Sequence, residues 1–219
     1  MRTRFLATSI ANAKCPTGPF SAHTISLRGI DPHFGEIIGQ LELQGEVPSR
    51  AAPYLYAMWR HARGDSSASH YPERAAACLE MLRLSAWLLN DVSGPGEVRE
   101  DERGGHWLGA TLGISLADRI MARLFAAIAK LDPRESLIIS EITTGTFEAL
   151  TRDALDGDAS IANLSRIIRS TSVTAAARIA NAQPHVIESA RIFADEMPLV
   201  ASLDEISSAL SHHLERMRQ

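Results

Sequence analysis

Apolar side chains recur at every third or fourth position along most of the chain after residue 32. In the clearest run a leucine or isoleucine occupies every fourth position, at Leu108, Leu112, Leu116, Ile120, Leu124 and Ile128. In an α-helix this spacing places all of these side chains on one face. The pattern therefore predicts a helix over residues 108–128 that buries this face.

The same spacing predicts further helices over residues 74–89, 133–150, 160–182, 184–196 and 199–217. Asp132 directly precedes Pro133, and an aspartate cap before a proline is typical of a helix start. After residue 30, no alternation of apolar and polar residues is long enough to indicate a strand. We therefore expect an all-α fold, with an irregular N-terminal segment over residues 1–31 and one helical domain over residues 32–219.

A second row on the helix over 108–128 mixes apolar and polar side chains: Thr111, Ile114, Asp118, Met121 and Phe125. A carboxylate held among apolar side chains is costly unless it is paired. We therefore expect Asp118 to be paired, most simply with an arginine.

Composition and charge exclude several classes of protein. The chain has 219 residues, 45% of them hydrophobic, and a formal net charge of −4, which suits a single soluble domain and gives no basic excess for nucleic acid. No run of about 18 apolar residues exists that would span a membrane. Cys15 and Cys78 lie far apart and show no metal-ligand spacing, so a reducing, cytoplasmic location is expected. The first thirty residues are basic, with no acid before Asp31, which leaves an N-terminal targeting segment open.

One stretch, Glu80 to Gly94, reads E-M-L-R-L-S-A-W-L-L-N-D-V-S-G. It resembles, without a gap, the E-L-x-H-x-x-x-L-x-H-D-D-x-x-D motif of the trans-isoprenyl diphosphate synthases, also called the polyprenyl synthetase family. The three aspartates of that motif correspond to Asn90, Asp91 and Gly94.

Other family motifs are matched in the same order along residues 35–215. The second aspartate motif, F-Q-x-x-D-D-x-x-D, resembles residues 200–208 and retains Asp204 and Glu205. The F-G-x(8)-G-D-x-L-L-A-R-A-F stretch resembles residues 108–125, and the G-E-L element resembles residues 145–147. The family's lysine–threonine pair corresponds to Ser170 and Thr171. Family members continue through several more helices, so the resemblance implies an isoprenoid-synthase-like bundle truncated at its C-terminus.

The resemblance also implies roles for individual residues. The family ionises an allylic diphosphate with Mg²⁺ held by carboxylates, because the leaving pyrophosphate carries several negative charges. By resemblance the metal ligands are Asn90, Asp91, Asp204 and Glu205, and the catalytic residues are Asp91 and Thr171. The diphosphate-binding residues implied are arginines, since the lysines expected near positions 49 and 170 are missing: Arg50, Arg99, Arg103 and Arg169.

Most of the diagnostic polar residues are altered, and each has a plainer interpretation. Asn90 is typical of a helix end, and Asp204 and Glu205 of a solvated helix face. We therefore expect a catalytically degenerate homologue that forms a homo- or hetero-oligomer with a prenyl synthase subunit, with an isoprenoid diphosphate as a further candidate ligand. The alternatives are an active Mg²⁺-dependent prenyltransferase or terpene-synthase-like enzyme, or an unrelated helical interaction domain. Mg²⁺ is the expected cofactor if the chain is active, and none is expected otherwise.

Overall fold

The computed structural model describes residues 48, 50–63, 72–93, 109–157, 160–197 and 203–217, with the backbone alone for 91–93, 109, 110, 112 and 203. All regular structure in these ranges is helical: α3 (Ala51–Arg63), α4 (Glu73–Ser93), α5 (Gly109–Ile128), α6 (Pro133–Asp156), α7 (Ile161–Ile179), α8 (Pro184–Glu196) and α9 (Leu203–Arg216). This confirms the predicted all-α class. None of these described helices is long and apolar enough to cross a membrane. The predicted N-terminal segment over 1–31 lies outside the described residues.

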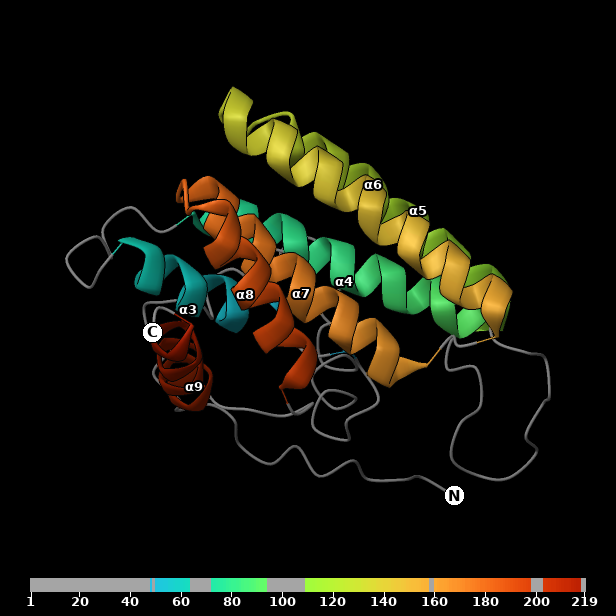
Figure 1. Ribbon diagram of the computed structural model, residues 1–219. Coiled ribbons are helices and arrows are strands. Elements are labelled where there is room, and N and C mark those ends of the chain that lie inside the picture. The colour runs from blue at the N-terminus through green and yellow to red at the C-terminus, as the bar shows by residue number, and fades with distance from the viewer. Residues whose placement is uncertain are drawn as a thin grey trace, which may run out of the picture.

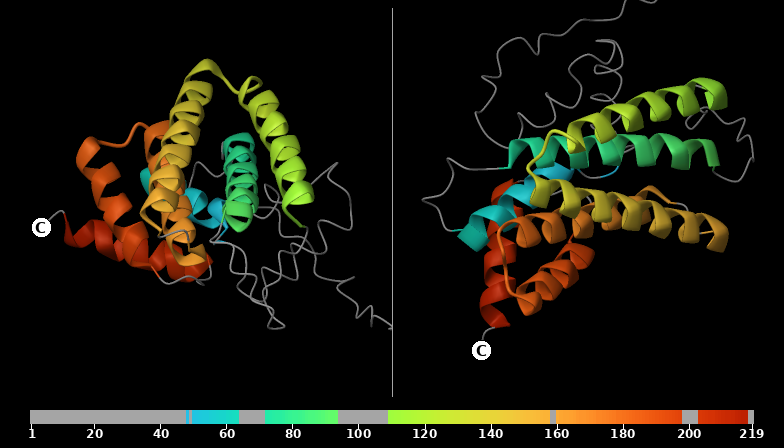
Figure 2. Two further views of the ribbon diagram at one scale, coloured as in Figure 1. Left: turned by 90° about the vertical axis from the view of Figure 1, so that its right-hand side faces the viewer. Right: turned by 90° about the horizontal axis from the view of Figure 1, so that it is seen from above.

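Helices α4 and α7 form the middle of the bundle (Figure 1). α4 packs against α3, α5, α6 and α7, and α7 packs against α3, α6 and α8. Figure 2 shows α5 and α6 diverging from their short connection, with α4 between them. α9 packs against α3 and α8. In both figures α9 lies at the end of the molecule opposite to the end of α4.

Helix α4 is buried on all sides and not on one face only. The sequence pattern predicted an inward face formed by Leu79, Leu82 and Ala86, and these side chains are indeed buried. Every other residue from 75 to 88 is buried too, because α3, α5, α6 and α7 surround this helix. The buried residues of α4 include two charged ones, Glu80 and Arg83.

Helix α5 buries the predicted row of leucine and isoleucine. Ile120, Leu124 and Ile128 are at most 5% exposed. The second row faces solvent, since Asp118 is exposed and Phe125 is 55% exposed. The premise that Asp118 is held among apolar side chains is therefore wrong: its side chain is exposed, and no ion pair to it is found within the described ranges. Among the described helices, α5 has α4 as its main neighbour, which covers one of its faces.

Local caps set the limits of several helices. The Asp132 side chain accepts hydrogen bonds from the backbone N–H groups of Arg134 and Glu135, which confirms the predicted cap of α6. α6 continues six residues beyond the predicted end and stops at Gly157, whose φ of 78° few other residues adopt. Ser160 caps α7 from outside the helix by accepting from the backbone N–H of Asn163.

Helix α3 is the element that the periodicity did not delimit. Its small side chains, Ala51, Ala52 and Ala57, mark no apolar face, and they are buried. They allow α3 to lie against α4, α7 and α9, all of which it contacts.

Candidate functional site

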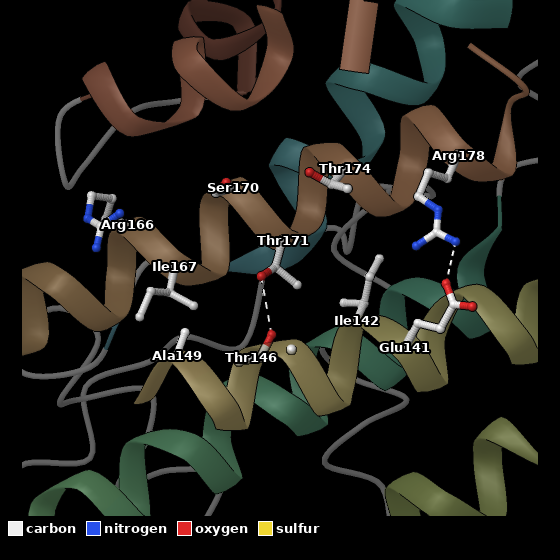
Figure 3. Close-up of a pocket in the computed structure, with 11 residues that line it drawn as sticks. Glu141, Ile142, Thr146, Ala149, Arg166, Ile167, Ser170, Thr171, Thr174 and Arg178 are labelled. Carbon is white, nitrogen blue, oxygen red and sulfur yellow. Dashed lines mark hydrogen bonds and ion pairs between the residues drawn. The ribbon is translucent and has the colours of Figure 1, made fainter. Parts of the chain in front are cut away.

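A groove of about 350 Å³ runs between α6 and α7 on the described part of the surface (Figure 3). Eleven residues line it: Glu141, Ile142, Gly145, Thr146, Ala149, Arg166, Ile167, Ser170, Thr171, Thr174 and Arg178. Its walls are therefore a mixture of aliphatic side chains, hydroxyls and a few charges.

Two of the stretches that resemble family motifs meet in this groove. Thr146, from the stretch at 145–147, and Thr171, from the lysine–threonine position, share a hydrogen bond of 3.2 Å between their hydroxyl oxygens (Figure 3). Thr146 is buried and Thr171 is half-buried. Beside them, Gly145 leaves open space, because a Cβ added there would meet no atom within 4 Å. Thr171 is thus the predicted site residue that the structure places in a groove.

The charged residues of the groove already have partners within the chain. Arg178 forms an ion pair with Glu141 that joins α7 to α6 (Figure 3). Arg166 donates from Nε to Asn163 Oδ1 at 3.0 Å, and its Nη1 lies 3.9 Å from Asp195 Oδ1 on α8. A ligand in the groove would therefore have to compete with these pairs for the arginines.

Arg169, which the resemblance assigns to diphosphate binding, does not line the groove. Its side chain is 4% exposed, and its Nε donates a 3.0 Å hydrogen bond to the carbonyl oxygen of Ala194 on α8. Burial lowers the pKa of Arg169, while the attraction of Tyr54 and Asp195 acts in the opposite direction. Arg169 thus links α7 to α8 through this hydrogen bond.

Three further arginines are predicted to bind diphosphate: Arg50, Arg99 and Arg103. Arg50 is half-buried immediately before α3. Arg99 and Arg103 lie outside the described residues.

The four predicted metal ligands lie on two helices. Asn90 is half-buried in the last turns of α4, and the neighbouring Asp91 belongs to the same helix, but its side chain lies outside the described part. Asp204 and Glu205 are exposed in the first turn of α9.

These two helix ends are far from each other. α4 has 21 residues and a helix of that length spans about 30 Å. α4 ends at the right of Figure 1, whereas α9 lies at the lower left against α3 and α8. Two ligands of one Mg²⁺ each lie about 2 Å from the ion. Asn90 and Asp204 are therefore not placed to share a cation.

The described residues contain no group of three or more His, Cys, Asp or Glu side chains that could hold a metal ion. Of the four residues that the resemblance assigns to Mg²⁺, Asn90, Asp204 and Glu205 do not come together in one site, and the side chain of Asp91 lies outside the described part. No step that depends on Mg²⁺ can be derived from them.

The contacts that join α6 to α7 leave no signal in the sequence. Glu141 and Arg178 are 37 residues apart, and nothing local in either segment pairs them. Thr146 could have been noticed from its place within the stretch at 145–147, but its partner could not, because helical spacing does not say which helices are neighbours.

Comparisons with protein-family models, with curated proteins and with solved structures find no match for this chain.

Proposed function

We propose that the chain is a catalytically degenerate relative of the isoprenyl diphosphate synthases that acts as a small partner subunit of a prenyl synthase. The proposal rests on the ordered resemblance of residues 35–215 to that family. The observation that carries it is the exposed apolar surface of α5 and α6 described below. The separation of Asn90 from Asp204 and Glu205, which stand on helices at opposite ends of the bundle, favours instead the alternative of an unrelated helical interaction domain.

The separation bears directly on chemistry. Departure of pyrophosphate needs several positive charges at the leaving group, and Mg²⁺ supplies them only when carboxylates hold it firmly. Asn90 is neutral, and the exposed Asp204 and Glu205 are remote from it. A chain built in this way is suited to binding and not to ionising an allylic diphosphate.

The exposed apolar side chains of α5 and α6 support a role in association. Ile114 and Phe125 on α5 are 42% and 55% exposed, and Leu137 and Leu155 on α6 are 59% and 83% exposed. Ile114 and Phe125 are eleven residues apart, close to three helical turns, so they lie on one face. Leu137 and Leu155 are eighteen residues apart, which is five full turns, and they too share a face. A partner helix that covers such faces would remove this apolar surface from water.

The first experiment tests catalysis by the chain alone. Purified protein is incubated with geranyl, farnesyl or geranylgeranyl diphosphate and Mg²⁺, and released pyrophosphate is measured against a full-length prenyl synthase as positive control. The proposal expects release no faster than in a blank without protein. Mg²⁺-dependent release by the chain alone would support the active-enzyme alternative instead.

The second experiment tests the partner role. The chain is added to a full-length prenyl synthase, and co-elution, turnover and product chain length are measured. We expect co-elution and a changed turnover or product length, and we expect Phe125→Glu to abolish both. Ala126→Glu introduces the same charge at an exposed neighbouring position on another side of α5 and serves as the matched control. If the chain neither associates with the synthase nor alters its kinetics, the result would point to an unrelated helical interaction domain.

A further inference from the structure

A small set of buried polar atoms gathers where α3, α7 and α8 pack together. Tyr54 on α3 is 2% exposed and Arg169 on α7 is 4% exposed. Tyr54 Oη, Arg169 Nη1 and Asp195 Oδ1 are all buried, and none has a hydrogen-bond partner among the described residues. Asp195 Oδ1 does form an ion pair with Arg166, whose Nη1 lies 3.9 Å away. A buried polar atom without a partner destabilises the folded state, so native proteins rarely leave one unpaired.

The three groups lie close enough to influence one another. Arg169 Nε is bonded to the carbonyl of Ala194, which precedes Asp195 in the chain, so the guanidinium lies beside the end of α8. Burial raises the pKa of Tyr54 and the positive charge of Arg169 opposes that shift. Asp195 in turn attracts Arg169.

The chemistry of the three atoms selects what fits between them. Arg169 Nη1 can only donate, Tyr54 Oη can donate, and Asp195 Oδ1 can only accept while ionised. An anion would accept from the two donors but would be repelled by the Asp195 carboxylate. A cation would be repelled by Arg169. A water molecule accepts two hydrogen bonds and donates two, so it matches all three groups.

We infer that one internal water molecule binds at this site and joins α3, α7 and α8 through Arg169 Nη1, Tyr54 Oη and Asp195 Oδ1. Buried waters with about three polar partners are held as part of the structure. The bridge gives Arg169 a positioning role at this junction, away from the groove between α6 and α7. It does not depend on the proposed function.

A crystal structure of the full chain at high resolution tests the site directly. The inference expects a solvent peak within hydrogen-bond distance of all three atoms, which stays free of anomalous signal after a bromide soak. A bromide peak would overturn it in favour of an anion, and a direct contact between Arg169 Nη1 and Asp195 Oδ1 would overturn it as well.

A double-mutant cycle tests the same bridge in solution. Tyr54 and Asp195 are not hydrogen-bonded to each other, but both interact with Arg169, so the cycle is measured in an Arg169→Met background. Without a shared water, Tyr54→Phe and Asp195→Ala should have additive effects on unfolding in that background. With the water, the two effects should differ from additivity by about fivefold in the unfolding equilibrium constant. The matched control combines Tyr54→Phe with Glu188→Ala on the same helix α8, where additivity is expected. Additivity in both cycles would overturn the inference.

Discussion

Arg83 Nε lies 2.7 Å from Glu80 Oε2, and both side chains are 0% exposed. The pair stands one turn apart in the middle of α4, and each partner also reaches beyond that helix. Glu80 Oε1 accepts a 2.9 Å hydrogen bond from the backbone N–H of Ala52, in the first turn of α3. Arg83 Nη1 donates a 3.0 Å bond to the carbonyl of Pro48. The pair thus fixes the start of α3 on α4, and the carboxylate meets the positive end of the α3 dipole.

Removing one member of this pair should be far more damaging than removing both. Glu80→Leu leaves the buried Arg83 guanidinium without its carboxylate, which costs about 3–5 kcal/mol. The double variant with Arg83→Leu removes both charges of this pair and should lose less than the single variant. Urea unfolding followed by circular dichroism measures both. A double variant as unstable as the sum of the single ones would show that the two charges are not coupled.

The sequence predicted the existence of most helices because their apolar spacing reflects burial on one face. The row on α5 and the Asp132 cap of α6 illustrate this. The prediction from apolar spacing failed for helices that are not buried on one face only. α4 is surrounded, so its pattern shows no clean face, and α3 is built from small residues. The outward row of α5 was misjudged because an amphipathic pattern does not say how many neighbours a helix has, and Asp118 is exposed there.

The groove between α6 and α7 shows a different limit. Family resemblance marked Thr171, but the contact with Thr146 depends on which helices become neighbours, and periodicity carries no such information. The resemblance also implies that Asn90 and Asp204 converge, whereas the structure places their helix ends apart. Motif order along a chain therefore did not fix the distance between the residues that the motifs name.

Two glycines should respond to alanine in opposite directions. Gly145 lies within α6, and a methyl group added there would meet open space. Because alanine lowers the conformational entropy of the unfolded chain, Gly145→Ala should stabilise the protein by about 0.5–1 kcal/mol. Gly157 ends the same helix at φ 78°, where a side chain is strained. Gly157→Ala should therefore destabilise by about 1 kcal/mol. Urea midpoints of the two variants measure the contrast, and a loss of stability in Gly145→Ala would mean that the groove does not have the space described.

The cap at Asp132 should make stability depend on pH. Backbone hydrogen bonds from Glu135 and Arg134 hold the pKa of Asp132 below its usual value. The stabilisation is therefore complete above the usual carboxyl range and is lost as the pH falls through the lowered pKa. Asp132→Asn keeps an acceptor for the cap without the charge. The gap in thermal midpoint between the wild type and this variant should narrow as the pH falls below about 4. A difference in thermal midpoint that does not change with pH would show that the charge of Asp132 does not contribute to the cap.

The thiol of Cys78 should weaken the protein in alkaline solution. Burial, with a smaller contribution from Glu135, raises the pKa of Cys78 from its ordinary 9.0 to about 12. The folded state therefore keeps the proton in this range, while the unfolded state releases it. The free energy of unfolding should then fall between those two values by at most about 1.4 kcal/mol per pH unit. Cys78→Ala removes this titration but leaves every other group in place, so its stability is the reference at each pH. Urea unfolding at about pH 8 and about pH 10 gives the free energy of unfolding of both proteins. Between these two pH values the wild type should lose more stability than Cys78→Ala. Equal changes in the two proteins would mean that Cys78 ionises as readily in the folded state as in the unfolded chain.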